Sequence, residues 1–293
     1  MRRGIILLGL LNFFVAFLIS CSHSSGKNRR HTTEDEQLSV ENSIAIIGQP
    51  DTDGNEPLIV KNSSDSSFNI CKPAPLSNTS EQLIEKTSYI VSYNKDTKTP
   101  NWVAWHLTAE HTDGPYGRLG NFHEDEDVPA PRATLADYRR SGWSRGHMCP
   151  AGDNKWDEQA MYESFALTNV CPQNASLNSG LWNSIEMDCR KWAKKYGGVY
   201  IVCGPVFLNK EHETIGGNRV VVPEAFFKVI LCLQGKPKAI GYIVRNTEGK
   251  KKKDQFVNTV DEVERITGMD FFPALSDDIE NEVEAHTNLD DWR

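Results

Sequence analysis

The fold is decided by Trp143-Ser144-Arg145-Gly146-His147-Met148, followed by Thr168-Asn169-Val170-Cys171-Pro172-Gln173 and then by Asn178-Ser179-Gly180-Leu181-Trp182. Glu186 and Arg190 complete the stretch, which gathers one imidazole, several amides, one carboxylate and two guanidinium groups within a short span. Such a collection of reactive and hydrogen-bonding groups indicates a functional site. We expect the rest of the chain to form the support that holds it.

The last part of this stretch has the pattern of an amphipathic helix. Apolar residues recur at i, i+4, i+8 and i+11, at Leu181, Ile185, Cys189 and Trp192. A neighbouring row at i, i+4 spacing holds Asn178, Trp182, Glu186 and Arg190. The pattern predicts a helix with one face in the core and polar groups along an edge. A strand-like segment is expected at residues 165–168, and Gly146 is expected to leave room for substrate beside His147.

Each of these residues has an ordinary explanation when it is taken alone. Glu186 and Arg190 can form a common i, i+4 ion pair, and a histidine beside a glycine is usually a turn residue. The order and spacing of the whole set are more specific than any single member.

The order of the three segments resembles the signature of the DNA/RNA non-specific endonuclease family, the ββα-metal nucleases that include endonuclease G. That signature is Asp-Arg-Gly-His, then Asn-x-x-Pro-Gln, then Leu-Asn-x-Gly-x-Trp-x-x-x-Glu-x-x-x-Arg. The chain has Ser144-Arg145-Gly146-His147, Asn169-Val170-Cys171-Pro172-Gln173 and Leu177-Asn178-Ser179-Gly180-Leu181-Trp182 with Glu186 and Arg190. The resemblance extends over residues 88 to 273, and Ser144 stands where the family has Asp.

The resemblance implies a metal-dependent hydrolase of phosphodiester bonds in DNA and RNA. His147 would be the general base, because an imidazole has a pKa near neutrality. Asn178 would be the only direct protein ligand of one Mg²⁺, with Mn²⁺ as the alternative ion, and Glu186 would orient the water ligands of the metal. Asn169 would support the geometry of the site. Three arginines would contact phosphate: Arg118, Arg145 and Arg190.

The remaining apolar runs predict an α+β fold. Two β-rich runs, at residues 89–93 and 102–107, are separated by a hairpin-like connection. Later runs alternate apolar and polar residues as antiparallel strands do, at residues 198–203, 218–223, 226–233 and 239–245. A last helix is expected at residues 256–268. The family fold is a central antiparallel β-sheet flanked by helices, with a ββα-metal finger that carries the active site.

The first residues have the features of a targeting segment. Arg2 and Arg3 precede an apolar run at residues 5–19, which is short for a membrane span. The following Leu18-Ile19-Ser20-Cys21 resembles a bacterial lipoprotein signal, with Cys21 as the lipid-bearing first residue of the mature protein. Ser22 after that cysteine indicates passage to the outer membrane of a bacterial cell envelope. A plain signal peptide with an incidental cysteine is the alternative.

Composition divides the chain into four parts. Residues 1–20 are the expected signal peptide, and residues 21–80, rich in Ser, Asn, Asp, Thr and Pro, are an expected flexible tether. A small ordered extension around Cys71 is the alternative for the end of that tether. Residues 81–275 form the expected endonuclease domain, and residues 276–293 an acidic tail exposed to solvent.

The net charge is unusual for a protein that binds nucleic acid. It is −8 at pH 7, and the loss of Arg2 and Arg3 with the signal peptide would make it more negative. Local clusters of cations compensate for the negative net charge. One cluster precedes His147 and consists of Arg132, Arg139, Arg140 and Arg145, and the other follows it and consists of Arg190, Lys191, Lys194 and Lys195. A further run, Lys250-Lys251-Lys252-Lys253, is read first as a solvated loop and second as a contact to nucleic acid.

Six cysteines remain if Cys21 carries lipid: Cys71, Cys149, Cys171, Cys189, Cys203 and Cys232. An even number in an exported protein allows disulfides, and buried free thiols are the alternative. No Cys-x-x-Cys is present, which argues against a zinc site.

Two other functions compete with the nuclease. One is a non-catalytic, lipid-anchored protein that binds nucleic acid, in which Ser144 marks decay of the active site; the other is a structural envelope lipoprotein. The intact His147, Asn178 and Glu186 argue against both. The absence of a carboxylate at Ser144 has two possible consequences. If the family Asp acts through its charge, His147 would stay neutral to lower pH. If the Asp acts through hydrogen bonds, the geometry of the site would change instead.

Overall fold

The structure is a computed structural model that describes residues 44–47, 58–61, 68–118, 120–247 and 252–293. The expected signal peptide, Cys21 and most of the tether lie outside the described residues. Two short antiparallel strands, β1 (Ile44–Ile47) and β2 (Leu58–Lys61), fall within the tether region. The ordered extension around Cys71 is present, since Phe68, Ile70 and Cys71 are buried. Among the described residues, no helix is both long enough and apolar enough to cross a membrane.

A seven-stranded antiparallel sheet forms the centre of residues 68–293, which confirms the expected central antiparallel sheet. The expected strand at residues 218–223 is not part of it, because only Val220–Val221 is a strand there and pairs with Thr214–Ile215 in a separate two-stranded sheet. Its spatial order is β13-β12-β11-β8-β5-β4-β3. The strands are β3 (Gln82–Glu85), β4 (Ile90–Asn94), β5 (Thr99–Thr108), β8 (Gly198–Val206), β11 (Ala225–Cys232), β12 (Lys238–Arg245) and β13 (Val257–Asn258). The predicted hairpin is the β4–β5 pair.

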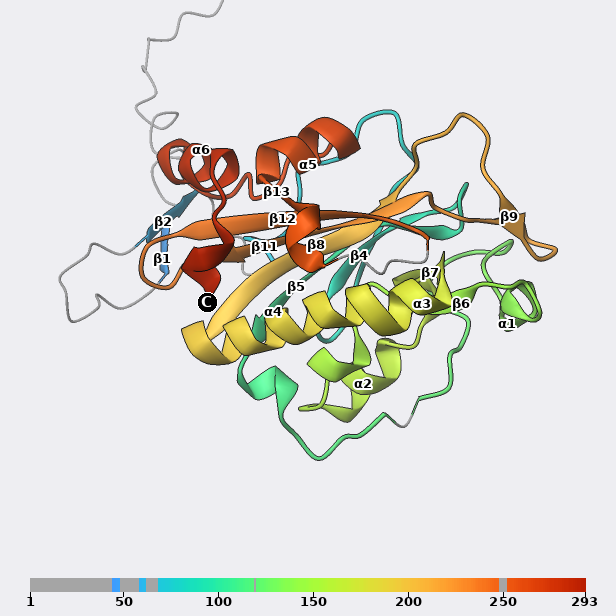
Figure 1. Cartoon of the computed structure of the whole chain (residues 1–293). Coiled ribbons are helices and arrows are strands. Elements are labelled where there is room, and N and C mark those ends of the chain that lie inside the picture. The colour runs from blue at the N-terminus through green and yellow to red at the C-terminus, as the bar shows by residue number, and fades with distance from the viewer. Residues whose placement is uncertain (1–43, 48–57, 62–67, 119, 248–251) are drawn as a thin grey trace, which may run out of the picture. The chain divides into compact units, whose positions relative to one another are not determined.

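Helices lie on both faces of this sheet, so its central strands are buried on both sides (Figure 1). One face packs against α4 (Asn183–Tyr196), and the other against α5 (Val260–Thr267) and α6 (Asp277–Ala285). In β11, Phe226 and Ile230 join the core on the α4 side, while Phe227 and Val229 join the core on the other side. Because strand residues alternate between faces, Lys228 projects toward α4.

The two ends of α5 follow from capping chemistry. Its first turn is capped by Thr259, whose Oγ1 accepts a hydrogen bond from the Glu262 amide at 3.2 Å. It ends at Gly268, which has a φ of 70° that glycine adopts without strain. The expected helix at residues 256–268 is therefore too long at its start, where a 3₁₀ turn (Lys253–Phe256) and β13 precede Thr259.

The expectation of a solvated tail at residues 276–293 is wrong. α6 packs with Val283 buried, and the following 3₁₀ turn (Leu289–Trp292) buries Trp292. The Trp292 ring lies 4.5 Å from the ring of Trp192 on α4. Most of the acidic residues of this segment cover its outer side, and its few apolar residues pack against α4 and α5.

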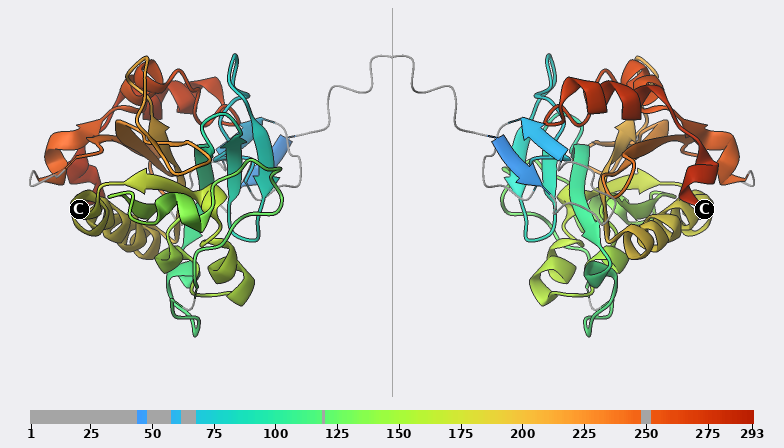
Figure 2. Two further views of the ribbon diagram at one scale, coloured as in Figure 1. Left: turned by 90° about the vertical axis from the view of Figure 1, so that its right-hand side faces the viewer. Right: turned by 90° about the vertical axis from the view of Figure 1, so that its left-hand side faces the viewer.

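A separate two-stranded ribbon carries the signature residues. β6 (Ser144–His147) pairs antiparallel with β7 (Val170–Gln173), and the chain continues through α3 (Ala175–Leu177) and a π-helical turn (Asn178–Trp182) into α4. Figure 2 shows this ribbon beside the sheet in two further views. The expected strand at residues 165–168 is wrong, because those residues form a turn and the start of a 3₁₀ helix (Leu167–Asn169). The strand begins only at Val170.

Short elements complete the surroundings of the ribbon. They are α1 (Leu135–Tyr138), α2 (Glu158–Glu163), β9 (Thr214–Ile215), β10 (Val220–Val221) and 3₁₀ turns at Glu110–Thr112 and Ala151–Asp153. The six cysteines of the described residues are all buried and free, so no disulfide forms among them in this structure.

Candidate active site

The ribbon and α4 bring five of the seven predicted site residues around one cavity of about 480 Å³. These are Arg118, His147, Asn178, Glu186 and Arg190. The cavity is also lined by Lys155, Asn183 and the turn at residues 150–152. Arg145 and Asn169 do not line it and act from outside. Segments that are distant in the chain thus converge as the ββα pattern predicts.

His147 is held at the end of β6 by aromatic rings. The side chain is 8% exposed, with the Phe122 ring centroid at 4.9 Å and the Phe165 ring at 5.1 Å. Burial, together with the charges of Arg118 and Arg145, lowers the pKa of His147 to about 3. Its Nε2 atom is buried and has no hydrogen-bond partner among the described residues. The imidazole of His147 is thus held neutral at the cavity that this residue lines.

Asn178 lies at the start of the π-helical turn, within reach of Ser144. Its Nδ2 donates to Ser144 Oγ at 3.3 Å, and Ser144 Oγ donates to the Gln173 carbonyl at 2.7 Å. This arrangement leaves the amide oxygen of Asn178 free to face a cation. Ser144 and His147 stand three positions apart on a strand, where their side chains leave opposite faces. The contact with Asn178 favours the geometric hypothesis for position 144 over the charge hypothesis.

Glu186 and Arg190 do not form the simple i, i+4 ion pair that is their ordinary explanation. Arg190 Nη1 instead donates to Asp153 Oδ1 at 2.8 Å, and Asp153 Oδ2 accepts from Trp105 Nε1 at 3.2 Å. Glu186 is buried beside them, and burial raises its pKa to about 7 although Lys228 and Arg190 oppose that shift. Arg190 is therefore fixed by a buried carboxylate, while Glu186 faces the cavity.

Lys228 is a charged residue beneath this site that the sequence interpretation did not select. It is fully buried, and its Nζ has no hydrogen-bond partner among the described residues. The ammonium lies 4.7 Å from the Trp182 ring centroid and 5.1 Å from that of Trp105. Burial opposes its charged form, but Cys203, Glu186 and other nearby groups outweigh burial and raise the pKa of Lys228. Its positive charge compensates the buried acids of the site.

Asn169 lies outside the cavity and bonds to the backbone next to it. It is fully buried, its Oδ1 accepts from the Cys149 amide at 2.9 Å, and its Nδ2 donates to the carbonyls of Cys149 and Ser164 at 2.8 Å each. These bonds fix the chain just after His147. Glycine is required at position 146 for a different reason from the one expected. A Cβ at Gly146 would lie 2.2 Å from Gln173 Oε1, which is too close. Its lack of a side chain allows ribbon packing.

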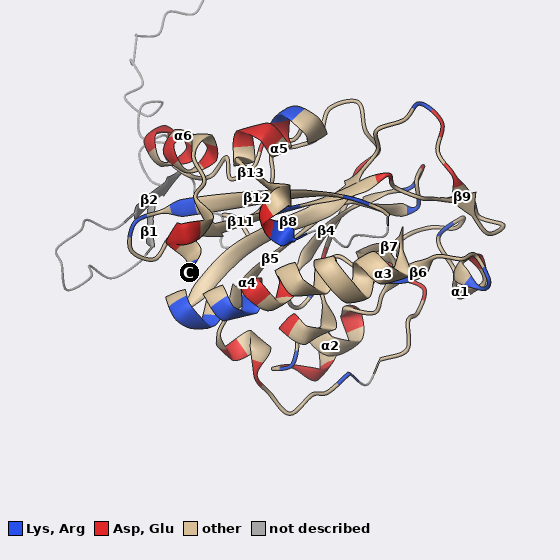
Figure 3. Cartoon of the chain, in the orientation of Figure 1, with Lys and Arg blue, Asp and Glu red and all other residues tan. Residues whose placement is uncertain are grey.

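The two exposed arginines lie over the rings that enclose His147. Arg145 Cζ is 4.6 Å from the Phe122 ring centroid, and Arg118 Cζ is 5.6 Å from that of Phe165. Both are therefore placed at the rim, where a phosphate group would approach. Two groups of the other cations expected near the site have different surroundings. Arg132 pairs with Glu124, and the lysines of α4 gather at the end of that helix away from the ribbon (Figure 3).

Three contributors were missed or left without a role: Asp153, Lys155 and Lys228. Asp153 follows the histidine closely and could have been considered as a partner for a cation. A single lysine within the apolar run Ala225–Cys232 was a usable signal, because a buried charge requires compensation. No sequence pattern indicated Lys155, which reaches the cavity from a loop.

The profile of the DNA/RNA non-specific endonuclease family matches residues 66–278. The chain belongs to this family. Among its relatives in that endonuclease family, the mitochondrial nuclease EXOG of Danio rerio is 39% identical over 206 residues, covering 64% of this chain and 60% of the relative. Mitochondrial endonuclease G of Bos taurus is 35% identical, covering 66% and 70%. Nuclease C1 of Cunninghamella echinulata var. echinulata is 37% identical, covering 67% and 85%.

A solved structure of an endonuclease of this kind has the same fold. It is the EndoG/EndoGI complex, with a TM-score of 0.67, 31% identity, and coverage of 72% of this chain and 91% of that chain. The chain spans about 60% of the length of the EXOG nucleases that it matches. This agreement confirms the predicted α+β fold with an antiparallel sheet and a ββα finger.

The donor atoms in this cavity fit a hard divalent cation. The amide oxygen of Asn178 and the carboxylate of Glu186 are oxygen donors that line the same cavity. No cysteine or second histidine lines it. A cation held by few protein atoms and completed by water is typical of Mg²⁺.

Proposed function

We propose that this chain is an endonuclease that hydrolyses phosphodiester bonds of DNA and RNA without sequence preference and depends on Mg²⁺. The observation that carries the proposal is the convergence of His147, Asn178, Glu186 and Arg190 on one cavity. This arrangement supplies a base, a cation-binding oxygen and a phosphate-binding guanidinium in one place. Membership of the DNA/RNA non-specific endonuclease family supports nucleic acid as the substrate class.

The chain's own residues divide the chemistry between them. The imidazole of His147 accepts the proton of the attacking water, and its lowered pKa keeps it unprotonated before the reaction. Arg190, held by Asp153, and the rim arginines Arg118 and Arg145 neutralise the phosphate. Asn178, with Glu186 behind it, would hold Mg²⁺, which supplies charge stabilisation for the developing negative charge of the leaving oxygen.

The cleavage should depend on the cation and on Asn178. The purified chain without residues 1–21 should nick supercoiled plasmid and degrade RNA in Mg²⁺, and EDTA should stop both. Asn178→Ala should need much higher Mg²⁺ for half-maximal rate, because loss of a ligand weakens binding of the ion. Ser179→Ala, one position along on the same turn, is the matched control. Cleavage at the same rate in EDTA as in Mg²⁺ would contradict a metal-dependent mechanism. Plasmid binding without cleavage would support the non-catalytic alternative.

We also propose that the protein is anchored to a bacterial envelope membrane by lipid on Cys21, with the outer membrane as the expected location. The support is the sequence Leu18-Ile19-Ser20-Cys21 after an apolar run. Mass spectrometry of the mature N-terminus should find Cys21 as the first residue with attached diacylglycerol, and Cys21→Ser should lose the lipid and leave the membrane fraction. A mature chain that begins at another residue would contradict the anchor.

A further inference from the structure

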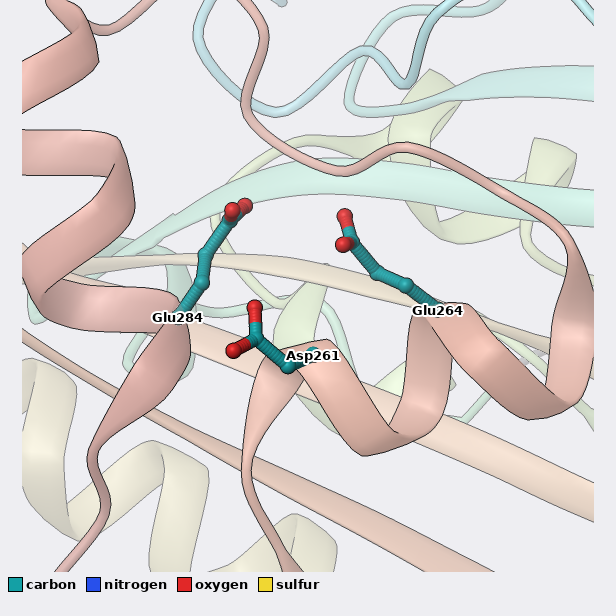
Figure 4. A group of neighbouring side chains, drawn as sticks. All are labelled: Asp261, Glu264 and Glu284. Carbon is teal, nitrogen blue, oxygen red and sulfur yellow. The ribbon is translucent and has the colours of Figure 1, made fainter.

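Three carboxylates far from the cavity described above converge between the two helices on the other face of the sheet. Asp261 and Glu264 are one turn apart on α5, and Glu284 comes from α6. One oxygen from each lies within 4.8 Å of the others. Figure 4 shows that Glu264 and Glu284 extend toward a common region from opposite helices, with Asp261 below them. None of the three forms an ion pair with a described residue.

Glu284 provides an independent sign that something is bound there. Its side chain is only 7% exposed, and its Oε1 is buried without a hydrogen-bond partner among the described residues. A buried carboxylate oxygen without a partner is costly, and native structures rarely retain one without a reason such as an ion. The unpartnered Oε1 belongs to the group that points between the helices (Figure 4).

The three carboxylates are held together by the packing of the two helices. Val263 of α5 and Val283 of α6 are buried in one core, which keeps the acidic side chains within 4.8 Å of one another. Ionised carboxylates at this separation repel each other, and a cation between the helices would offset that repulsion.

We propose that Asp261, Glu264 and Glu284 form a second divalent cation site, of the calcium type, that fastens α6 to α5. Carboxylate oxygens are the ligands that Ca²⁺ prefers, and its flexible coordination accepts backbone oxygens and waters for the rest. The three oxygens lie within 4.8 Å of one another, close enough for one ion to contact all of them. Ca²⁺ tolerates irregular ligand geometry better than Mg²⁺, which demands a near-ideal octahedron.

This site is separate from the catalytic proposal. Asp261 and Glu264 lie within residues 66–278, which match the endonuclease family, and Glu284 lies beyond them, so the site would join the C-terminal segment to the family domain. It would hold that segment in place and would not take part in cleavage. Failure of either proposal leaves the other intact, because binding and thermal stability report on this site without any nuclease assay.

The test uses the full chain, freed of metal with a chelator, and carries Asn178→Ala so that the catalytic cavity does not contribute. Calorimetric titration with CaCl₂ at pH 7.5 should find one Ca²⁺ bound. Free Ca²⁺ at a hundred times its Kd should raise Tm by about 5–10 °C, because a ligand that binds only the folded state stabilises it. MgCl₂ should bind more weakly and raise Tm less at the same concentration.

Glu284→Gln should abolish both the heat of binding and the rise in Tm. The variant keeps the size of the side chain and removes one charge, so the metal-free protein should be at least as stable as the parent at pH 7.5. Glu282→Gln, on the exposed side of the same helix, is the matched control and should respond to Ca²⁺ as the parent does. A parent protein that binds no Ca²⁺ at 10 mM, or a Glu284→Gln variant with an undiminished response, overturns the proposal. Stabilisation by mildly acidic pH alone, without a response to Ca²⁺, also overturns it and identifies a proton as the occupant.

Discussion

Replacement of His147 by alanine should lower kcat/KM for plasmid cleavage in Mg²⁺ by at least about a hundredfold, the lower end of what a general base contributes. The physical reason is that the imidazole of His147 is the proposed proton acceptor, and loss of the ring leaves the cavity without it. Single-turnover cleavage measures the loss directly, because it excludes product release.

The control for this variant is His286→Ala, which removes an exposed histidine after α6 and should retain the parent rate. Circular dichroism and Tm should show that both variants remain folded. The pH dependence provides a second readout. Because the pKa of His147 is lowered to about 3, the parent enzyme should show no acid limb from this histidine near pH 6.5. If His147→Ala retains nearly the activity of the parent, His147 is not the general base.

Replacement of Lys228 by methionine should destabilise the fold by roughly 3–5 kcal/mol, the usual cost of removing one partner from a buried charge group. Methionine fills a similar volume but leaves Glu186 and Asp153 without the cation that lies beneath them. Urea unfolding measured against pH is the appropriate experiment, because m should stay constant while the midpoint moves.

The deficit of this variant should depend on pH in a definite direction. The folded-state pKa of Glu186 is already raised to about 7, so the folded state keeps a proton that the unfolded state has lost, and stability declines as pH rises from 4.5 toward 7. Without Lys228 that pKa rises further, so the deficit grows with pH and the decline extends above 7. Adding Glu186→Gln to Lys228→Met should restore part of the stability at pH 8. A deficit that is the same from pH 5 to pH 8 would contradict a role in charge compensation.

Local patterns were sufficient to predict the elements that carry the site. Leu181, Ile185, Cys189 and Trp192 are all buried on one side, as their spacing indicates. Helical periodicity is a property of neighbouring residues and needs no tertiary information. The three signature segments likewise predicted which elements meet, because a ββα unit is continuous in the chain. The exact start of β7 was missed, since turn and strand propensities compete over residues 165–170.

Some features of the site could be predicted from the sequence, and others only from the tertiary structure. Sequence order alone gathered His147, Asn178, Glu186 and Arg190, and the structure places all four at one cavity. Only the fold showed that Arg190 is held by Asp153, that Ser144 lies against Asn178, and that Arg132 pairs with Glu124. These depend on which side chains project into the same space, which spacing within one element does not determine.

The sequence by itself determined the family, the sheet, and the helix that presents Glu186 and Arg190, because these follow from hydrophobic period and from a contiguous motif. The tertiary structure alone decided the position of Lys228 under the site and the packing of α6 with Glu284 buried against α5. Both are charges whose partners lie far away in the chain. A charged side chain is predicted from sequence to be solvated, and only packing of distant elements can remove it from water, because the free energy of burying a charge depends on the groups that surround it.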